Sequence, residues 1–231
     1  MALINDFLSL IYPRYCEACG RYLFRSEHQI CRLCKLTLPK CILHPQALNP
    51  VQIELGGRVP LQEALCLFMF EKSGRVQRLV HAIKYEGQKD LAVNLGKWLG
   101  REYLESGRLP DFDMVLPVPL HPTKQKLRGY NQSEEFAKGL CFTLQAQMRN
   151  DLLFRLRASS TQTRKKKFQR WQNVEGIFGM KDETQLEGRH VLLVDDVLTT
   201  GATVDAAWQA MQHIPGIRLS LACIAFAKQH A

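Results

Sequence analysis

The sequence predicts an α/β protein with a parallel sheet, preceded by a small module that a metal ion holds together. Apolar runs of strand length alternate with segments of helical periodicity from about residue 60 onward, which is typical of parallel strands joined by crossover helices. Five of the eight cysteines fall before residue 45. The chain has 231 residues, 46% hydrophobic and 23% charged, which suits one globular α/β domain with an appendage and excludes a disordered or fibrous protein.

The first element in order is an apolar segment, Met1 to Ile11. It has no positive charge before its apolar part and no small-residue cleavage site, so it does not fit a signal peptide. We expect a short amphipathic helix that ends before Pro13 and packs its apolar side chains inward: Leu3, Phe7, Leu8 and Leu10. No run approaches the ~20 apolar residues that span a bilayer, and we expect a cytoplasmic protein.

The cysteine module follows. Cys16 and Cys19 form one C-x2-C pair, and Cys31 and Cys34 form another. In a reducing cytoplasm this pattern favours a tetrahedral structural zinc site over disulfides, and so small a segment needs such a staple to fold. Two alternatives stay open: Cys41 and His44 can supply ligands, and four thiolates can also hold an iron–sulfur cluster. The other cysteines, Cys66, Cys141 and Cys223, are expected to be small buried hydrophobic residues.

A change in composition marks the end of this module. Pro45 to Pro60 contains further Pro and Gly residues and predicts a linker or an opening hairpin. We therefore expect two domains, residues 1–50 with the N-terminal helix and zinc module, and residues 51–231 with the α/β fold. Strands are expected at Ala64 to Phe70, Asp113 to Val118, Leu152 to Leu156, Val191 to Val194 and Leu219 to Ala227. Helices are expected at Arg75 to Tyr85, Leu91 to Leu104, Ser133 to Met148 and Thr203 to His213.

The most informative stretch joins the fourth of these strands to the last helix. Asp195 and Asp196 follow the strand, and a hydroxyl-rich turn leads into the helix. Ligands of open α/β sheets bind at the carboxyl ends of strands. The backbone amides of the turn and the helix N-terminus suit a phosphate, Gly201 permits close approach, and Thr199, Thr200 and Thr203 add hydroxyl donors. Ordinary turn chemistry does not explain two adjacent acids, whereas a ribose with Mg²⁺ does. The formal charge of +9 also favours a phosphorylated partner.

These residues resemble the phosphoribosyl pyrophosphate (PRPP) motif of type I phosphoribosyltransferases, in which an apolar strand leads into paired acids and a T-T-G-x-T loop. The resemblance implies that Asp195 and Asp196 hold the ribose hydroxyls beside Mg²⁺ and act as catalytic residues. It also implies that Thr199, Thr200, Gly201, Ala202 and Thr203 hold the 5′-phosphate. In this fold the segment after the second strand carries the pyrophosphate, and the expected donors there are Lys124, Lys126, Arg128, Asn131 and Gln132. Lys84 is a further candidate for PRPP binding.

Nearly the whole chain resembles the ComF (ComFC/GntX-like) family of competence proteins. The matching segments are the two C-x2-C pairs, Ile83-Lys-Tyr-x-Gly87, Pro117-Val-Pro, Arg128-Gly-Tyr-Asn-Gln, Gln162-Thr163, Arg170-x-x-Asn173-Val-x-Gly-x-Phe178 and the Asp195 loop. The chain departs from the family at Lys165, where leucine is usual, and at Ser159, where threonine is common.

Both departures fall in an expected mobile loop, Ala158 to Asn173. Four consecutive cations precede Phe168, Arg170 and Trp171 there, and cations with aromatic residues are typical of single-strand binders. Lys165, Lys166, Lys167, Arg170 and Trp171 are therefore candidate DNA ligands. A solvated lid whose cations clamp pyrophosphate explains the same residues equally well.

Two functions follow from these features. The family resemblance implies a PRPP-binding protein that handles imported single-stranded DNA in natural transformation, beside a DNA-translocating helicase and the recombination loader DprA. The alternative is a phosphoribosyltransferase of nucleotide metabolism or salvage, in which Mg²⁺ and the cationic loops stabilise departing pyrophosphate. No acceptor pocket is evident from the sequence, so a non-catalytic PRPP sensor also fits.

Overall fold

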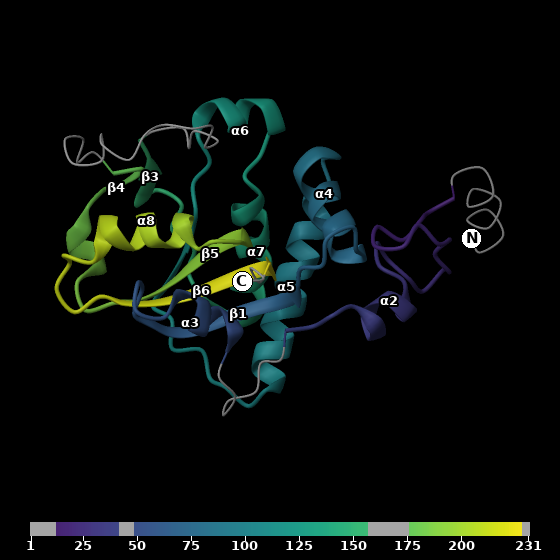
Figure 1. Ribbon diagram of the computed structural model, residues 1–231, viewed down its shortest axis with the longest axis horizontal. Helices are drawn as coiled ribbons and strands as arrows, with labels where there is room; N and C mark the ends of the chain where they lie inside the picture. The colour runs from purple at the N-terminus through teal and green to yellow at the C-terminus, as the bar shows by residue number, and fades with distance from the viewer. Residues whose placement is uncertain (1–12, 42–48, 157–175, 228–231) are drawn as a thin grey trace.

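The computed structural model describes residues 13–41, 49–156 and 176–227. The helix expected at Met1 to Ile11 lies outside these ranges. Four parallel strands form the main sheet in the order β1-β6-β5-β2, and two short antiparallel strands, β3 and β4, form a second one (Figure 1). The predicted α/β fold with a mainly parallel sheet is therefore confirmed.

The elements occur in the following order along the chain. The strands are β1 (Leu61–Met69), β2 (Met114–Pro117), β3 (Leu153–Arg155), β4 (Phe178–Met180), β5 (His190–Leu198) and β6 (Arg218–Phe226). The helices are α2 (Arg32–Thr37), α3 (Pro50–Leu55), α4 (Arg75–Tyr85), α5 (Lys89–Glu105), α6 (Pro122–Arg128), α7 (Gln132–Leu144) and α8 (Ala202–Met211), with a 3₁₀ turn at Glu183–Leu186.

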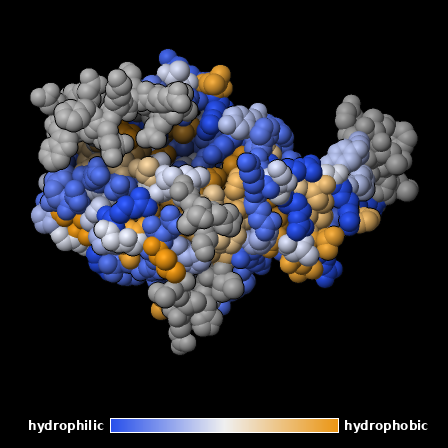
Figure 2. Space-filling view, viewed as in Figure 1, coloured by the Kyte–Doolittle hydropathy of each residue, from blue (hydrophilic) through white to orange (hydrophobic). Residues whose placement is uncertain are grey.

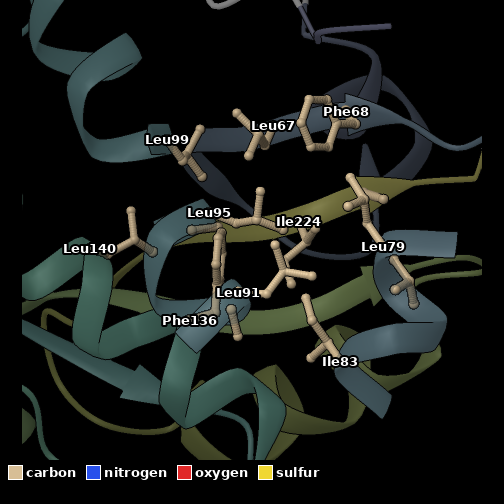
Figure 3. Packing of buried hydrophobic residues seen from close by; sticks show 14 of the residues in the cluster. Leu67, Phe68, Leu79, Ile83, Leu91, Leu95, Leu99, Phe136, Leu140 and Ile224 are labelled. Carbon is tan, nitrogen blue, oxygen red and sulfur yellow. The ribbon is translucent and has the colours of Figure 1, made fainter. Parts of the chain in front are cut away.

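Helices cover both faces of the main sheet, because its strands are apolar on both sides. Helices α4, α5 and α7 pack on one face, where Leu67, Leu95 and Ile224 belong to a single buried cluster (Figure 3). Helices α3 and α8 pack on the other face, in a second cluster that contains Leu55 and Val204. The arrangement is a three-layer α/β sandwich.

The cysteine module lies at one end of the molecule beside α4 and α5 (Figure 1). Its buried residues, among them Cys16 and Ile30, belong to the same apolar cluster as α4 and α5. Residues 39–41 also extend the sheet: the amide of Cys41 donates to Leu67 O at 3.0 Å, and that of Met69 donates to Pro39 O at 2.8 Å. Packing and backbone hydrogen bonds therefore fix the module to the α/β fold.

Three predicted elements differ from the structure. Pro50 to Leu55 is a helix and not a linker or hairpin, since Asn49 caps it by accepting from the Val51 amide and Pro50 occupies its first turn. Helix α7 ends at Leu144 and not at Met148, because Gln145 adopts a left-handed conformation. Strand β5 continues to Leu198, so Asp195 and Asp196 lie within it and not beyond its end.

Candidate functional site

Asp195 and Asp196 lie near the carboxyl end of β5, beside the segment that follows β2. The two strands are paired through Pro117 and Val194, which brings the start of α7 to the same edge of the sheet. The hydroxyl of Ser133, in the first turn of α7, donates to Asp195 Oδ1 at 3.2 Å. Asp196 Oδ2 forms an ion pair with Lys84 Nζ of α4 at 3.1 Å. Each carboxylate therefore has its own partner on a different helix.

The pKa of Asp195 is raised to about 7, above the ordinary 3.8 of this side chain. Burial is the main cause, and the adjacent negative charge of Asp196 adds to it. The amide of Asp196, which donates to Asp195 Oδ1 at 2.8 Å, the charge of Lys84 and the Ser133 hydroxyl oppose this rise. A bound cation would favour the ionised form of such a carboxylate, so the pair fits a site that binds Mg²⁺.

The loop after β5 has the geometry of an anion cradle. Gly201 caps the start of α8 with a left-handed φ of +77°, and the ten-residue helix directs its free amides toward the turn. A Cβ at Gly201 would clash with Leu55 Cδ2 of α3. Thr199, Thr200 and Ala202 are exposed, whereas Thr203 is half-buried. Glycine is required here for two reasons, its backbone conformation and the close packing of α3.

Arg58 is a contact of this loop that the sequence analysis missed. Its Nη2 donates to Thr200 O at 3.1 Å and to Glu54 O of α3 at 3.1 Å. One guanidinium therefore ties the loop to the end of α3. No local motif predicts this contact, because Arg58 is 142 residues from Thr200 in the sequence. Recognition of a helix at residues 50–55 was the signal that could have placed Arg58 near the loop.

A cationic cavity of about 430 Å³ adjoins the carboxylate pair through Lys84. It lies between the end of α4 and helix α6, and its lining contains Lys84, Lys124 and Arg128 but no acid. Arg128 stacks over Tyr85 at 5.5 Å from the ring centre and donates to Gln132 Oε1 at 2.9 Å. The segment after β2, for which no helix was predicted, forms the exposed helix α6 and ends at Gly129 in a left-handed conformation. The cavity suits a small polyanion.

Asn131 and Gln132 are held mainly by the protein itself. Asn131 Oδ1 caps α7 by accepting from the Ser133 amide at 3.1 Å, and its Nδ2 donates to Val118 O at 2.9 Å. Gln132 is fully buried, and its Nε2 has no hydrogen-bond partner among the described residues. Both residues thus position the start of α7, and Gln132 also orients Arg128.

The four cysteines of the paired motif form one cluster. The Sγ atoms of Cys16, Cys19, Cys31 and Cys34 all lie within 4.8 Å of one another, and Cys19 Sγ is 3.8 Å from Cys31 Sγ. A tetrahedral zinc with Zn–S bonds of about 2.3 Å requires sulfur separations of about 3.8 Å. Amide and guanidinium donors approach the sulfurs: the Cys31 amide lies 3.3 Å from Cys16 Sγ, and Arg75 Nη1 lies 3.6 Å from Cys34 Sγ. The donor set fits a metal such as zinc.

The remaining cysteines lie elsewhere. Cys41, Cys66 and Cys223 are buried in the apolar cluster of the opposite sheet face, so Cys41 is not part of the four-cysteine cluster. Cys141 is only half-buried. His44 and the candidate DNA ligands Lys165, Lys166, Lys167, Arg170 and Trp171 lie outside the described residues. Within the described ranges, no helix is both long and apolar enough to cross a membrane.

Comparison with known proteins agrees with this geometry. Residues 143–231 match the family model described as "Phosphoribosyl transferase domain". The chain is 33% identical over 205 residues to the "DNA utilization protein YhgH" of Escherichia coli K12. The aligned region covers 84% of this chain and 89% of the relative. It is also 33% identical over 131 residues to "Competence protein F" of Haemophilus influenzae, covering 55% of this chain and 57% of that one.

A third relative is "Competence protein ComFC" of Bacillus subtilis, 28% identical over 201 residues that cover 87% of this chain and 72% of the relative. Identity above 30% over most of both chains, together with the paired cysteines and the phosphoribosyltransferase domain, shows common descent. The chain therefore belongs to the ComF (ComFC/GntX-like) family.

Proposed function

We propose that the chain binds PRPP with Mg²⁺ and acts in the handling of imported single-stranded DNA during natural transformation. Asp195 and Asp196 would hold the ribose hydroxyls beside the metal. Thr199, Thr200, Gly201, Ala202 and Thr203 would hold the 5′-phosphate. The pyrophosphate would be held by Lys84, Arg128, Asn131 and Gln132. Mg²⁺ would supply positive charge between the pyrophosphate oxygens and the carboxylates.

One observation carries the PRPP proposal. A carboxylate pair, an amide-lined turn and a cationic cavity without acids lie at one edge of the sheet. Together they match a ligand that has a polyol, a phosphate and a pyrophosphate. The ion pair between Lys84 and Asp196 links the carboxylate pair to the cavity, so a single ligand can contact both parts. We also propose the division into residues 1–50 and 51–231, and zinc as the metal of the cysteine cluster.

The DNA part of the proposal rests on the family. The relatives are named for DNA utilization and for competence, and the formal charge of +9 favours a polyanionic partner. We propose a cytoplasmic protein in which Lys165, Lys166, Lys167, Arg170 and Trp171 contact DNA, with a DNA-translocating helicase and DprA as its partners.

Calorimetry with Mg²⁺ and PRPP tests the ligand. The double variant Asp195→Asn/Asp196→Asn should bind at least about 100-fold more weakly, because two charge-assisted contacts are lost. Glu105→Gln, which removes an exposed acid at the far end of α5, should bind as the wild type does. If the double variant retains wild-type affinity, PRPP binding at this site is wrong. Complementation of DNA uptake in a null strain by the same variant then tests whether the ligand matters for transformation.

A phosphoribosyltransferase acting on a base or an amine is the second candidate. It is favoured by the family-model match and by the roughly 430 Å³ cavity beside Asp196, in which cations can stabilise departing pyrophosphate. Pyrophosphate release from PRPP that depends on one added acceptor would support it. If PRPP binds measurably but no nucleobase or amine tested causes pyrophosphate release, the transferase candidate is wrong and only the binding role remains.

A further inference from the structure

We propose that an aromatic face of the cysteine module, formed by Tyr15, Tyr22 and Phe24, is a stacking platform for single-stranded DNA. This inference rests on the proposed DNA role and assigns it to a surface outside the phosphoribosyl site.

The three rings lie on one side of a two-stranded turn. Tyr15 and Tyr22 are paired across the turn. The flanking hydrogen bonds run from the Cys16 amide to Arg21 O and from the Leu23 amide to Arg14 O, both at 2.8 Å. Tyr15 and Tyr22 are therefore a non-hydrogen-bonded pair, in which side chains approach most closely. Phe24, two residues beyond Tyr22, shares its side of the strand and meets its ring edge-on at 6.5 Å between centroids.

Exposure separates these rings from the apolar core of the module. Tyr15, Tyr22 and Phe24 are 56%, 40% and 68% exposed, whereas Cys16 and Leu23, which point the opposite way, are at most 3% exposed. Apolar surface lies among hydrophilic surface at the end of the molecule that carries α2 (Figure 2). Adjacent large aromatic rings that are exposed to solvent are typical of a binding surface.

Cations surround the face. Six Lys and Arg residues and only two acids lie between residues 13 and 41, so the module stays positive even after four thiolates bind a Zn²⁺ ion. The two acids lie beside donors of the protein itself. Glu27 accepts from the amides of Phe24 at 2.9 Å and Arg32 at 2.6 Å, and Glu17 lines a cavity next to Arg78 of α4. Arg14, Arg21 and Arg25 are the chain neighbours of the three rings.

With a metal bound to the four cysteines, the platform would be held in place before any ligand binds. The cysteine cluster lies at one end of the turn, and Glu27 joins the Phe24 amide to the Arg32 amide at the start of α2. Little conformational entropy remains to be lost on binding, which favours affinity. Rings held in this way accept any base by stacking but cannot reach bases within a duplex, so the surface selects single strands.

Aromatic and cationic groups continue from this face toward the carboxylate site. Tyr15 shares a cavity of about 390 Å³ with Arg78 and His81 of α4, and Glu17 and Glu86 line the same cavity. His81 lies 4.9 Å from Tyr85 between ring centroids, and Arg128 stacks over Tyr85. Rings thus continue from the aromatic face toward the carboxylate site, and Arg78 and Arg128 supply positive charge along the way.

Fluorescence anisotropy with a labelled 15-nucleotide oligothymidylate and zinc-loaded full-length protein tests the inference. Tyr22→Ala/Phe24→Ala should weaken binding at least about 20-fold, since each stacked base contributes roughly 1 to 3 kcal/mol. Tyr22→Phe/Phe24→Tyr, which keeps both rings, should bind as the wild type does. Arg14→Gln/Arg21→Gln should lower the magnitude of the salt slope of log K by about 1.4. Phe142→Ala removes a ring 73% exposed on α7 and should change nothing.

Each result has a distinct meaning, provided that zinc content and thermal unfolding match the wild type. If wild-type protein binds no oligothymidylate, both this inference and the DNA role are wrong, while PRPP binding stands on its own calorimetric test. If Lys165→Ala/Lys166→Ala loses binding and Tyr22→Ala/Phe24→Ala does not, the DNA role survives and the aromatic face is wrong. If the aromatic variant alters only self-association in sedimentation, the face joins copies of the chain and the inference is overturned. Photocrosslinking of 5-iododeoxyuridine to residues 13–25 would support it directly.

Discussion

Replacing Asp195 by asparagine is expected to stabilise the protein, and to do so more as pH rises. In the folded protein the pKa of Asp195 is about 7, against an ordinary value of 3.8. The folded state therefore holds a proton that the unfolded chain has released between these two values, so stability falls as pH rises across this window. Asparagine does not titrate, and its Oδ1 can still accept from Ser133 and from the Asp196 amide.

The size of the effect follows from the shift. About three pKa units at 1.36 kcal/mol each give an upper limit of about 4 kcal/mol above pH 7 and almost nothing below pH 4. Part of the rise comes from the neighbouring charge of Asp196 and not from burial, so we expect the stability advantage of the variant to widen by about 2 kcal/mol between pH 5 and pH 8, less than this limit.

Urea unfolding of both proteins at pH 5 and pH 8, without Mg²⁺, measures this widening. Protonation of the cysteine cluster cancels, since both proteins carry the same cysteines. Any contact made by the new amide is independent of pH, so it changes the stability difference between variant and wild type equally at pH 5 and at pH 8. An advantage that stays constant or shrinks from pH 5 to pH 8 would refute the reasoning that burial holds a proton on Asp195. A stabilised variant that also loses PRPP binding would mark this carboxylate as one kept for function at a cost in stability.

Three further predictions follow from the site and the cysteine module. Gly201→Ala should lower the free energy of unfolding in urea by about 2 to 4 kcal/mol, because of the left-handed φ and the clash with Leu55. The control Gly57→Ala has a similar φ of +80° and no neighbour within 4 Å, and should lower it by only about 1 kcal/mol. Equal losses would show that α3 moves to make room for the new methyl group. Arg58→Ala should weaken Mg²⁺-PRPP binding about 5-fold in calorimetry, because the loop loses a hydrogen bond worth about 1 kcal/mol, and Arg58→Lys should recover part of the affinity; unchanged affinity would remove Arg58 from the site. Zinc removal by a chelator, or Cys16→Ser, should lower the midpoint of thermal unfolding by about 5 to 10 °C, because the module shares its core with α4 and α5; metal analysis should find one zinc per chain, and stoichiometric iron with visible absorbance would contradict the assignment.

Local sequence patterns predicted the fold class and the candidate residues of the phosphate loop. An apolar run followed by two acids and a T-T-G turn predicts a strand, a ligand site and a helix N-terminus within a dozen residues, because each of these features depends on neighbours in the chain. The spacing of Cys16, Cys19, Cys31 and Cys34 predicted a metal cluster for the same reason. The family resemblance extended these local patterns to the whole chain, and the relatives confirmed it.

Tertiary structure decided what those residues contact. Sequence predicted Asn131 and Gln132 as pyrophosphate donors, and it did not show that Asn131 caps α7 or that Gln132 is buried beside Arg128. It gave no sign that Arg58 and Leu55 pack on the phosphate loop, since they are far from it along the chain. The raised pKa of Asp195 and the exposure of the Tyr22 and Phe24 rings have the same origin. Protonation and exposure depend on which atoms surround a side chain, and only the packing of distant segments sets those surroundings.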